Sequence, residues 1–228
     1  MPRHSAFLAL VTLVASAAPP LHSQGRDRGL VEMPPRAVRS GLYFVGALGA
    51  GSEQCKLGAS SEFPASECGT LNAAGNPLPD NGKTWRDPIT SPAFALRLGG
   101  TPSPSVRLGA ELMGWSGDNG PTTERTVGLL ATAQFYPSKR AGFYLKGGLG
   151  YGWSSVDFND GSRSPTETGF LFNVGAGYEF ALTPHVAIAP LVDFYQGVYP
   201  RAGDQTITER IAFFGVSLTV QSGDRHWR

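Results

Sequence analysis

The sequence predicts an all-β protein: an eight-stranded antiparallel, up-and-down transmembrane β-barrel that follows a cleaved signal peptide. Three observations predict this fold. Eight segments of roughly ten residues alternate apolar with small or polar side chains, the connectors between them run long and short in turn, and the chain begins with the pattern of an export signal. Tilted strands of about ten residues are long enough to cross a bilayer.

The amino-terminal 23 residues have the features of a secretory signal peptide. An apolar run of about twelve residues, Ala6–Ala17, follows a short positive region and lies in the usual length range. Ala15-Ser16-Ala17 is a small-residue cleavage site, and Leu21-His22-Ser23 is a later alternative. We therefore assign residues 1–23 to the signal peptide and residues 24–40, which show no periodicity, to a flexible periplasmic lead-in.

The composition suits a chain that crosses lipid without helices. Of the 228 residues, 16% are charged and 30 are glycine. Removal of the signal peptide takes away Arg3 and leaves 18 basic and 18 acidic side chains, so the mature chain has no net charge to attract nucleic acid. No run of about 18 apolar residues follows the signal peptide. An exported chain of this kind can still span a membrane as a closed barrel, because closure pairs every backbone group.

The eight predicted strands are segments in which about every second side chain is apolar. In the fourth, Val127, Leu129 and Phe135 share one face. The strands together predict a barrel domain over residues 41–220, followed by a short periplasmic tail at 221–228. In chain order the predicted strands are Leu42–Ala50, Ser91–Gly99, Val106–Trp115, Arg125–Tyr136, Phe143–Trp153, Thr168–Phe180, Val186–Gln196 and Arg210–Val220.

The connectors alternate in length, and this alternation predicts the orientation. Short turns of a transmembrane barrel lie on the periplasmic side and long loops lie outside. An even number of strands then places both termini in the periplasm. The short connectors are Gly100–Ser105, Pro137–Gly142 and Leu182–His185, and the long ones are Gly51–Pro88, Ser116–Glu124, Ser154–Glu167 and Val198–Thr208.

The face opposite the apolar one indicates which side meets lipid. A soluble barrel would cover that face with many Lys and Glu, whereas here it is rich in Gly, Ala and Thr. Small side chains fit the narrow interior of an eight-stranded barrel, so we expect the apolar face to meet outer-membrane lipid. Buried charges must be paired, so the few interior charges are expected to form a neutral network that plugs the lumen; the alternative is a polar pore lining. The network residues are Arg97, Arg107 and Lys146 with Glu111, Glu179 and Asp193.

Two further predictions concern the lipid face. Pro190 lies in the middle of a strand and lacks a ladder donor, so we expect a bulge there. Aromatic side chains near the strand ends are expected to form two interfacial girdles. These girdles would consist of Tyr136, Phe143, Tyr144 and Phe180 at one end and Trp115, Tyr151, Trp153 and Tyr195 at the other.

The only two cysteines, Cys55 and Cys68, fall in the first long connector. An exported chain meets an oxidising compartment, so the two thiols are expected to form a disulfide. Closing a loop of this size stabilises the fold by roughly 3 kcal/mol. Two thiols without a histidine in the same connector would make a poor zinc site.

The remaining motifs do not point to catalysis. After cleavage at residue 23 the histidines are His185 and His226, which fall in a short connector and in the tail, out of reach of a site on the outer rim. The Asp, Asn and Gly residues of 116–121 and 157–161 lack the spacing of an EF-hand and are typical of turns. We expect no enzyme activity, no cofactor and no bound metal.

The signal sequence, the eight strands and their loop alternation resemble the small eight-stranded outer-membrane barrels of the OmpA transmembrane-domain type. The resemblance covers about residues 41–220. Gly215–Val220 is similar to the terminal signal that the barrel-assembly machinery reads, although Phe213 stands where a polar residue is usual and the tail 221–228 follows. OmpA-type proteins carry a peptidoglycan-binding domain after the barrel, and this short tail cannot supply that activity.

The resemblance implies a non-enzymatic integral protein of the outer membrane of a Gram-negative-type bacterium, with loops that contact an extracellular ligand or surface partner. The largest connector offers Lys83, Trp85 and Arg86 for such contacts. The first alternative is a narrow pore or a transport barrel for small molecules, and the second is a secreted soluble barrel that binds a ligand inside. Outer-membrane lipid and the barrel-assembly machinery are the expected partners, and nucleic acid is not.

Overall fold

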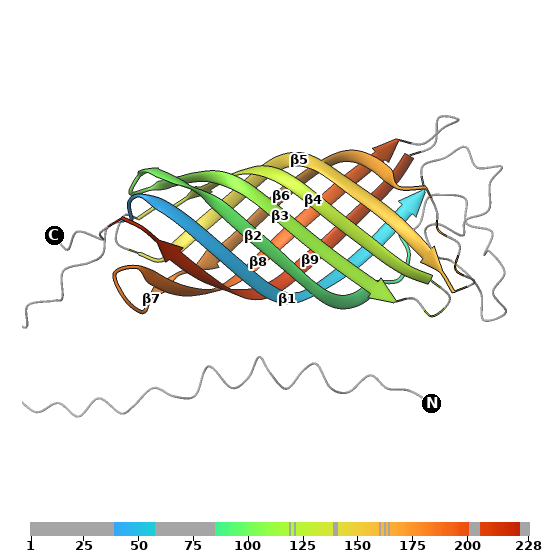
Figure 1. Cartoon of the computed structure of the whole chain (residues 1–228), viewed down its shortest axis with the longest axis horizontal. Helices are drawn as coiled ribbons and strands as arrows, with labels where there is room; N and C mark the ends of the chain where they lie inside the picture. The colour runs from blue at the N-terminus through green and yellow to red at the C-terminus, as the bar shows by residue number, and fades with distance from the viewer. Residues whose placement is uncertain are drawn as a thin grey trace, which may run out of the picture. The chain divides into compact units, whose positions relative to one another are not determined.

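The described part of the chain forms a closed antiparallel β-barrel in the computed structural model (Figure 1). The structure describes residues 39–57, 85–118, 120, 122–138, 141–159, 161, 163, 165–200 and 206–223. The predicted signal peptide, most of the lead-in, the last five residues of the tail, Cys68 and His226 lie outside these ranges. None of the described residues belongs to a helix long and apolar enough to cross a membrane.

Each strand pairs with its neighbours in the sequence, and two pairings close the barrel. β1 pairs with both β2 and β9, and β6 pairs with both β5 and β8. The two-residue β7 continues β6 beyond Glu179, so the wall consists of eight strands, as predicted. The strands are β1 (Leu42–Leu57), β2 (Ile89–Ser103), β3 (Val106–Asp118), β4 (Thr122–Phe135), β5 (Phe143–Phe158), β6 (Glu167–Tyr178), β7 (Phe180–Ala181), β8 (Val186–Pro200) and β9 (Thr206–Gln221).

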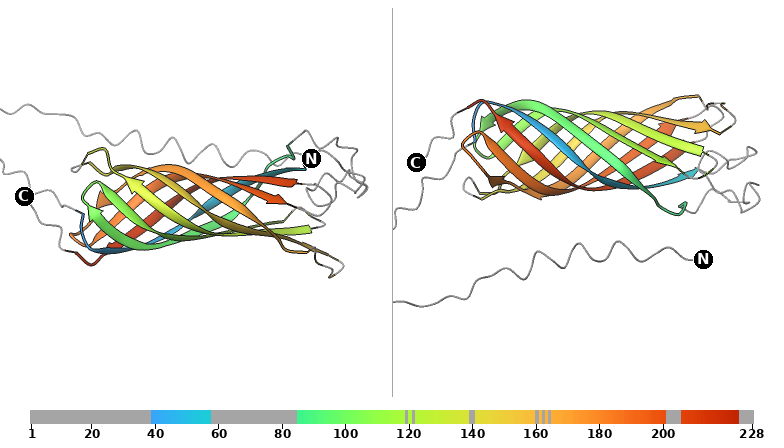
Figure 2. Two further views of the ribbon diagram at one scale, coloured as in Figure 1. Left: turned by 90° about the horizontal axis from the view of Figure 1, so that it is seen from above. Right: turned by 60° about the horizontal axis from the view of Figure 1, so that its bottom comes forward.

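The strands incline steeply to the barrel axis, and β1 begins at the same end of the barrel at which β9 finishes (Figures 1 and 2). We call this the terminus end and the opposite end, where β1 runs into the first connector, the loop end. The connectors at the terminus end span two residues between β2 and β3, seven between β4 and β5 (136–142) and four between β7 and β8 (182–185).

Seven of the eight wall strands are longer than the sequence predicted, at 13 to 16 residues, whereas β6 has 12. Three of the four predicted long connectors are therefore short, spanning residues 119–121, 159–166 and 201–205, and only the connector between β1 and β2 is long. The inward and outward alternation continues into these extensions, and backbone pairing satisfies donors and acceptors at the rim as well as inside the bilayer. The predicted strands end at the length that a bilayer requires. The ladder of hydrogen bonds continues beyond that length.

The apolar face points outward, as predicted. Leu48 is 73% exposed and Phe214 is 60% exposed, and the outward residues of every wall strand continue this surface. We call this surface the apolar belt. It consists of the outward apolar side chains of the eight wall strands, for example those between Leu42 and Ala50 on β1 and between Phe214 and Val220 on β9. A continuous apolar surface of this extent suits lipid contact and not exposure to water.

The bulge predicted at Pro190 is not found. β8 pairs with β9 in one register through Pro190 and Val216, with no extra residue. On its other side the ladder is interrupted, because β6 ends at Tyr178 and β7 resumes at Phe180 in the same register. A proline cannot donate to a ladder, and its position opposite this gap accommodates the missing donor without a change in register.

Half of the predicted aromatic girdle lies inside the barrel. Tyr136, Tyr144, Trp115 and Tyr195 are at most 2% exposed, whereas Phe143, Tyr151 and Phe180 face outward. The error comes from strand parity, since residues one position apart point to opposite faces. Their position near a strand end indicates where these side chains lie along the barrel axis. It does not indicate whether they point inward or outward.

Inward-facing glycines make room for these large interior side chains. A Cβ atom added at Gly177 would lie 2.5 Å from the Tyr144 hydroxyl oxygen, and one at Gly197 would lie 2.5 Å from that of Tyr199. The glycines therefore leave room for a tyrosine ring from the paired strand, Tyr144, and from the same strand, Tyr199, to lie against the backbone. The interior combines small residues with large ones, and it is not lined by small residues alone.

Candidate functional site

Four of the six charged residues predicted in the lumen form one ion-pair cluster near the middle of the chain's strands. Arg97 and Glu111 are cross-strand neighbours on β2 and β3, with Nε and Oε2 2.7 Å apart. The Lys146 ammonium on β5 lies 2.7 Å from Glu111 Oε2 and 2.6 Å from Asp193 Oδ2 on β8. The Tyr195 hydroxyl donates to Glu111 Oε1 at 2.8 Å. We call these residues the central cluster; they tie four wall strands together across the lumen.

The other two predicted charges belong to a second cluster, centred on Glu179 at the break between β6 and β7. Arg107 pairs with Glu179 and donates to Tyr136 at 2.7 Å. Arg39 reaches the same carboxylate with Nε 3.2 Å from Oε2, and its guanidinium carbon lies 3.6 Å from the centre of the Tyr136 ring. The Arg107 guanidinium also donates to Gln221 Oε1 at 3.1 Å. These five residues form the terminus-end cluster, and Arg39, which the sequence placed in the lead-in, is buried within it.

A third cluster, which the sequence did not predict, lies at the loop end. Arg86 forms ion pairs with Glu53 on β1 and Glu124 on β4. Close by, the Thr126 hydroxyl donates to Glu209 Oε1 on β9 at 2.6 Å. All of these side chains are buried, so one arginine faces three buried carboxylates. We call these residues the loop-end cluster.

Arg86 is held by its backbone as well as by its side chain. Its N–H donates to the Cys55 carbonyl at 3.0 Å, and its own carbonyl accepts from Gln54 Nε2 at 2.9 Å. The chain therefore turns inward just before β2 begins and places the guanidinium in the mouth of the barrel. This contact fixes the described end of the first connector beside β1.

The loop-end cluster could have been found by extending the alternation of each strand. Inward positions on β1 continue from Gly51 to Glu53 and Cys55, and on β9 Glu209 lies between the inward residues Ile207 and Ile211. Glu53, Glu124 and Glu209 all fall in the predicted connectors or just beyond the predicted strand ends. Nothing in the local pattern indicated that Arg86 would be their partner, because its position depends on the fold of the connector.

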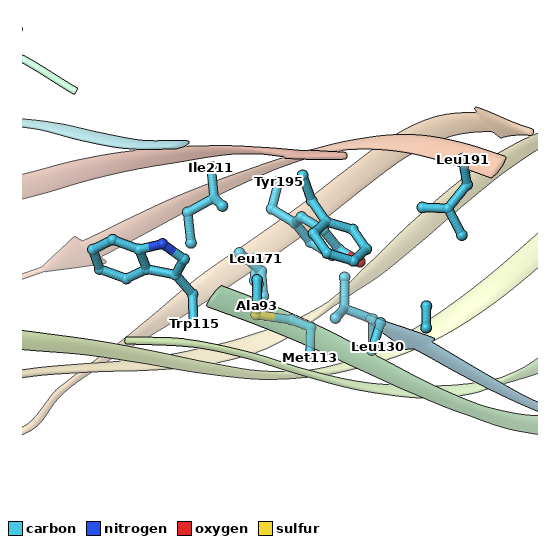
Figure 3. Close-up of a cluster of buried hydrophobic side chains, with 11 residues drawn as sticks. Ala93, Met113, Trp115, Leu130, Leu171, Leu191, Tyr195 and Ile211 are labelled. Carbon is cyan, nitrogen blue, oxygen red and sulfur yellow. The ribbon is translucent and has the colours of Figure 1, made fainter. Parts of the chain in front are cut away.

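Apolar side chains fill part of the lumen as well. Met113, Leu130, Leu171 and Ile211 pack together with Trp115, whose ring nitrogen donates to the Gly51 carbonyl at 2.9 Å. Figure 3 shows this group extending along the barrel interior from Trp115 past Tyr195 to Leu191. The described interior thus resembles the core of a soluble protein, with ionic clusters and an apolar layer in contact with one another.

A shallow apolar hollow of about 800 Å³ lies on the wall over β3 to β6. The small side chains Ala131, Ala133 and Gly147 form its floor, with larger neighbours such as Leu108 and Phe170 around it. No charged residue lines it. Its mostly apolar lining, in which Thr132 and Asn173 are the polar side chains, suits contact with lipid acyl chains.

The described residues of the candidate metal-binding segments lie at the ends of β3 and β5 and in the bends that follow them. Gly120 and Gly161 have φ angles of +80° and +86°, which glycine adopts without strain, and the Gly120 N–H donates to Asp118 Oδ1 at 2.7 Å. Asp157 instead pairs with Arg125 and Arg163, and the hydrogen bond from Arg163 lowers the pKa of the Asp157 carboxyl from its usual value. Within the described ranges, no three His, Cys, Asp or Glu side chains are placed to hold a metal ion.

The remaining candidates are placed as follows. Cys55 is buried at the loop end, and since Cys68 lies outside the described residues the Cys55–Cys68 disulfide remains a prediction. His185 lies in the turn between β7 and β8, at the terminus end. The loop-end rim and this histidine are therefore at opposite ends of the barrel.

Comparison with known proteins identifies a family for most of the barrel. A family model described as "Outer membrane protein beta-barrel domain" matches residues 42–197, which run from the start of β1 into β8. No curated protein matches the sequence significantly.

Solved outer-membrane proteins are similar to this chain in structure at low sequence identity. Neisserial surface protein A is 16% identical, with a TM-score of 0.49 over 80% of this chain and 99% of that one. The attachment invasion locus protein Ail of Yersinia pestis is 11% identical, with a TM-score of 0.40 over 78% and 99%. OprG of Pseudomonas aeruginosa is 10% identical, with a TM-score of 0.40 over 80% and 98%.

Proposed function

The chain belongs to the outer membrane protein beta-barrel domain family, and we propose that it is a non-enzymatic outer-membrane protein whose closed barrel holds a surface-contact connector at the loop end. The observation that carries this proposal is the filled lumen. Three ionic clusters and an apolar layer occupy the described barrel interior, and the side chains at the loop-end mouth bind Arg86 at the described end of the connector between β1 and β2.

The proposed orientation has both termini in the periplasm and the loop end outside. The short connectors at the terminus end and the long connector at the other support it, because outer-membrane barrels have short periplasmic turns and longer outer loops. The expected partners are outer-membrane lipid along the apolar belt, the barrel-assembly machinery during insertion, and an extracellular ligand or surface partner. The outward side chains of Val216, Leu218 and Val220 on β9 are consistent with a terminal assembly signal.

The two alternatives differ from this proposal in what the interior must do. A secreted soluble barrel is inconsistent with the family and with the outward apolar belt.

A pore needs a continuous polar path through the barrel. The side chains of the central cluster and of the apolar layer fill the lumen where such a path would run. Wild-type protein in planar bilayers is therefore expected to give no steady current. A steady conductance that changes in Arg97→Ala or Glu111→Ala would instead establish the pore.

The connector between β1 and β2 is the element to test. Replacement of residues 58–84 by a short Gly-Ser linker is expected to leave barrel assembly intact, because Arg86 and its contact to Cys55 are retained and the two ends of the deleted segment lie side by side. Gel mobility with and without boiling reports assembly. Adhesion of expressing cells to immobilised serum and extracellular-matrix proteins reports surface contact, which we expect to be lost.

A scrambled 58–84 segment that keeps Cys68 in position is the matched control for this replacement. If the scrambled segment supports adhesion as well as the native one, the length of the connector matters and its sequence does not. If the Gly-Ser variant adheres like the wild type, the connector is not the functional surface.

A further inference from the structure

A basic and aromatic group of side chains lies on the outer wall at the loop end, on the opposite face of the strands from the ionic clusters. It consists of Lys56 on β1, Arg210 on β9 and Trp85, which precedes β2; we call it the rim cluster. The Arg210 guanidinium carbon lies 3.9 Å from the centre of the Trp85 ring, and the Lys56 ammonium lies 5.1 Å from it. All three side chains are half-buried and keep part of their surface open.

The rim cluster is held in a defined geometry before any ligand arrives. Gln54 and Arg210 are cross-strand neighbours, and Nε and Nη2 of Arg210 donate to Gln54 Oε1 at 3.0 and 2.7 Å. The amide nitrogen of the same glutamine donates to the Arg86 carbonyl. The guanidinium is thus oriented by a neutral acceptor and an aromatic ring, with Nη1 left for a further acceptor. Preorganised donors of this kind bind at a smaller entropic cost.

Among the described residues, the charge of the rim cluster has no ion-pair partner: no carboxylate lies within 4 Å of the Lys56 ammonium or the Arg210 guanidinium. By contrast, Arg125 and Arg163, two other described outward cations at this end, share the carboxylate of Asp157. Two neighbouring positive charges with no counterion among the described residues favour an anionic ligand.

The position of the rim cluster indicates where that anion comes from. Arg210 precedes Phe214, the large apolar outward side chain of β9 nearest this end, by four positions on the same face. Four residues span about 13 Å along a strand, or about 10 Å along the axis of a barrel whose strands tilt by about 40°. The cluster therefore lies at the depth of lipid headgroups, and an indole ring is a typical residue of that interface.

We propose that Lys56 and Arg210 bind the phosphate of an anionic lipid headgroup at the loop-end surface of the membrane. Arg210 Nη1 and the Lys56 ammonium donate to phosphate oxygens, Trp85 covers the headgroup side of the contact, and the acyl chains lie along the apolar belt below. Through Gln54 the bound lipid is linked to the backbone of Arg86, so the headgroup and the loop-end cluster hold the base of the connector from opposite sides of the wall.

Native mass spectrometry of the full-length mature protein, folded in zwitterionic detergent, tests this site. The probes are lipid A with both phosphates, the same lipid after dephosphorylation, phosphatidylglycerol, and inorganic phosphate. We expect phosphorylated lipid to be retained and dephosphorylated lipid A to be lost. The Lys56→Gln/Arg210→Gln variant should bind phosphorylated lipid at least about tenfold more weakly, since it removes two charge-assisted contacts. Lys56→Gln alone, which breaks no hydrogen bond within the described residues, keeps the test valid if the double variant does not fold.

Arg125→Gln is the matched control, since it removes an outward cation at the same end that already has a carboxylate partner. Its lipid binding should stay within about twofold of the wild type, because an exposed, paired cation contributes little. Equal retention of the dephosphorylated lipid, an equal loss in Arg125→Gln, or binding of inorganic phosphate that matches the lipid would each overturn the proposal. Retention of phosphatidylglycerol as well as lipid A supports it and identifies the phosphate as the common determinant.

Discussion

Lys146→Met is expected to lower the free energy of unfolding by about 3–5 kcal/mol, because it removes the cation that two buried carboxylates share. The ammonium lies within 2.7 Å of both Glu111 and Asp193, and all three side chains are shielded from solvent. Glu111 retains Arg97, but Asp193 keeps only the Tyr195 hydroxyl, at 3.3 Å, among its described side-chain partners. Urea titration in lipid vesicles, followed by tryptophan fluorescence, measures the change.

A double variant separates the charge effect from a packing effect. Lys146→Met combined with Asp193→Leu removes the uncompensated carboxylate and leaves the Arg97–Glu111 pair in place. We expect it to recover at least half of the stability lost in the single variant, since replacing a buried ion pair by apolar residues of similar size is often nearly neutral. The single variant Asp193→Leu completes the comparison. If the losses of stability in Lys146→Met and Asp193→Leu add up to the loss in the double variant, the ion pair between Lys146 and Asp193 does not carry the stability of the central cluster.

Arg86→Gln should destabilise the loop end by a similar amount, about 3–5 kcal/mol at neutral pH. The change leaves Glu53, Glu124 and Glu209 without a cation in the described mouth of the barrel. Protonation removes the charges of Glu53 and Glu209, and burial together with the neighbouring carboxylates favours the neutral form of these two groups in the folded variant. The loss should therefore be largest at pH 8 and shrink as the pH falls to 5, the direction expected when the folded state binds more protons than the unfolded one.

Arg163→Gln provides the comparison for this prediction. Arg163 also pairs with a carboxylate, but its side chain is 61% exposed, so its loss should change the free energy of unfolding far less than the loss of Arg86. Unfolding of the wild type and both variants in vesicles at pH 5 and pH 8 gives the loss of stability of each variant at each pH. A loss in Arg86→Gln that does not depend on pH would show that the arginine acts through packing and its backbone contacts, and not by compensating the three glutamates.

The residues that predicted the fold did so through periodicity alone. Alternation at positions such as Val127, Leu129 and Phe135 is sufficient to define a strand and its lipid face, because successive side chains of a strand point to opposite sides. The same rule, applied strictly, would have placed Tyr136 and Tyr144 inside and extended β1 to Glu53. The alternation in the sequence was therefore sufficient to predict whether each strand residue points inward or outward. The exact residues at which the strands end could not be predicted in this way.

The pairing partners within the lumen could not be read from the sequence in the same way. Arg97, Arg107, Lys146, Glu111, Glu179 and Asp193 all lie inside, yet they divide into two clusters whose membership depends on the relative stagger of eight tilted strands. That stagger follows from closure of the whole barrel, which is a property of every strand together. Local pattern gives the face of a residue, and only closure gives its height and its neighbours.

The sequence by itself determined an exported, eight-stranded barrel with an apolar exterior and charged residues inside, because these follow from composition and from a period of two. The tertiary structure decided that Arg39 and Arg86, from segments with no periodicity, enter the two ends of the barrel, and that Lys56, Trp85 and Arg210 meet on its outer rim. These contacts join residues up to 140 positions apart in the chain, as between Arg39 and Glu179. Such contacts depend on how the intervening strands pair, so no local signal can specify them.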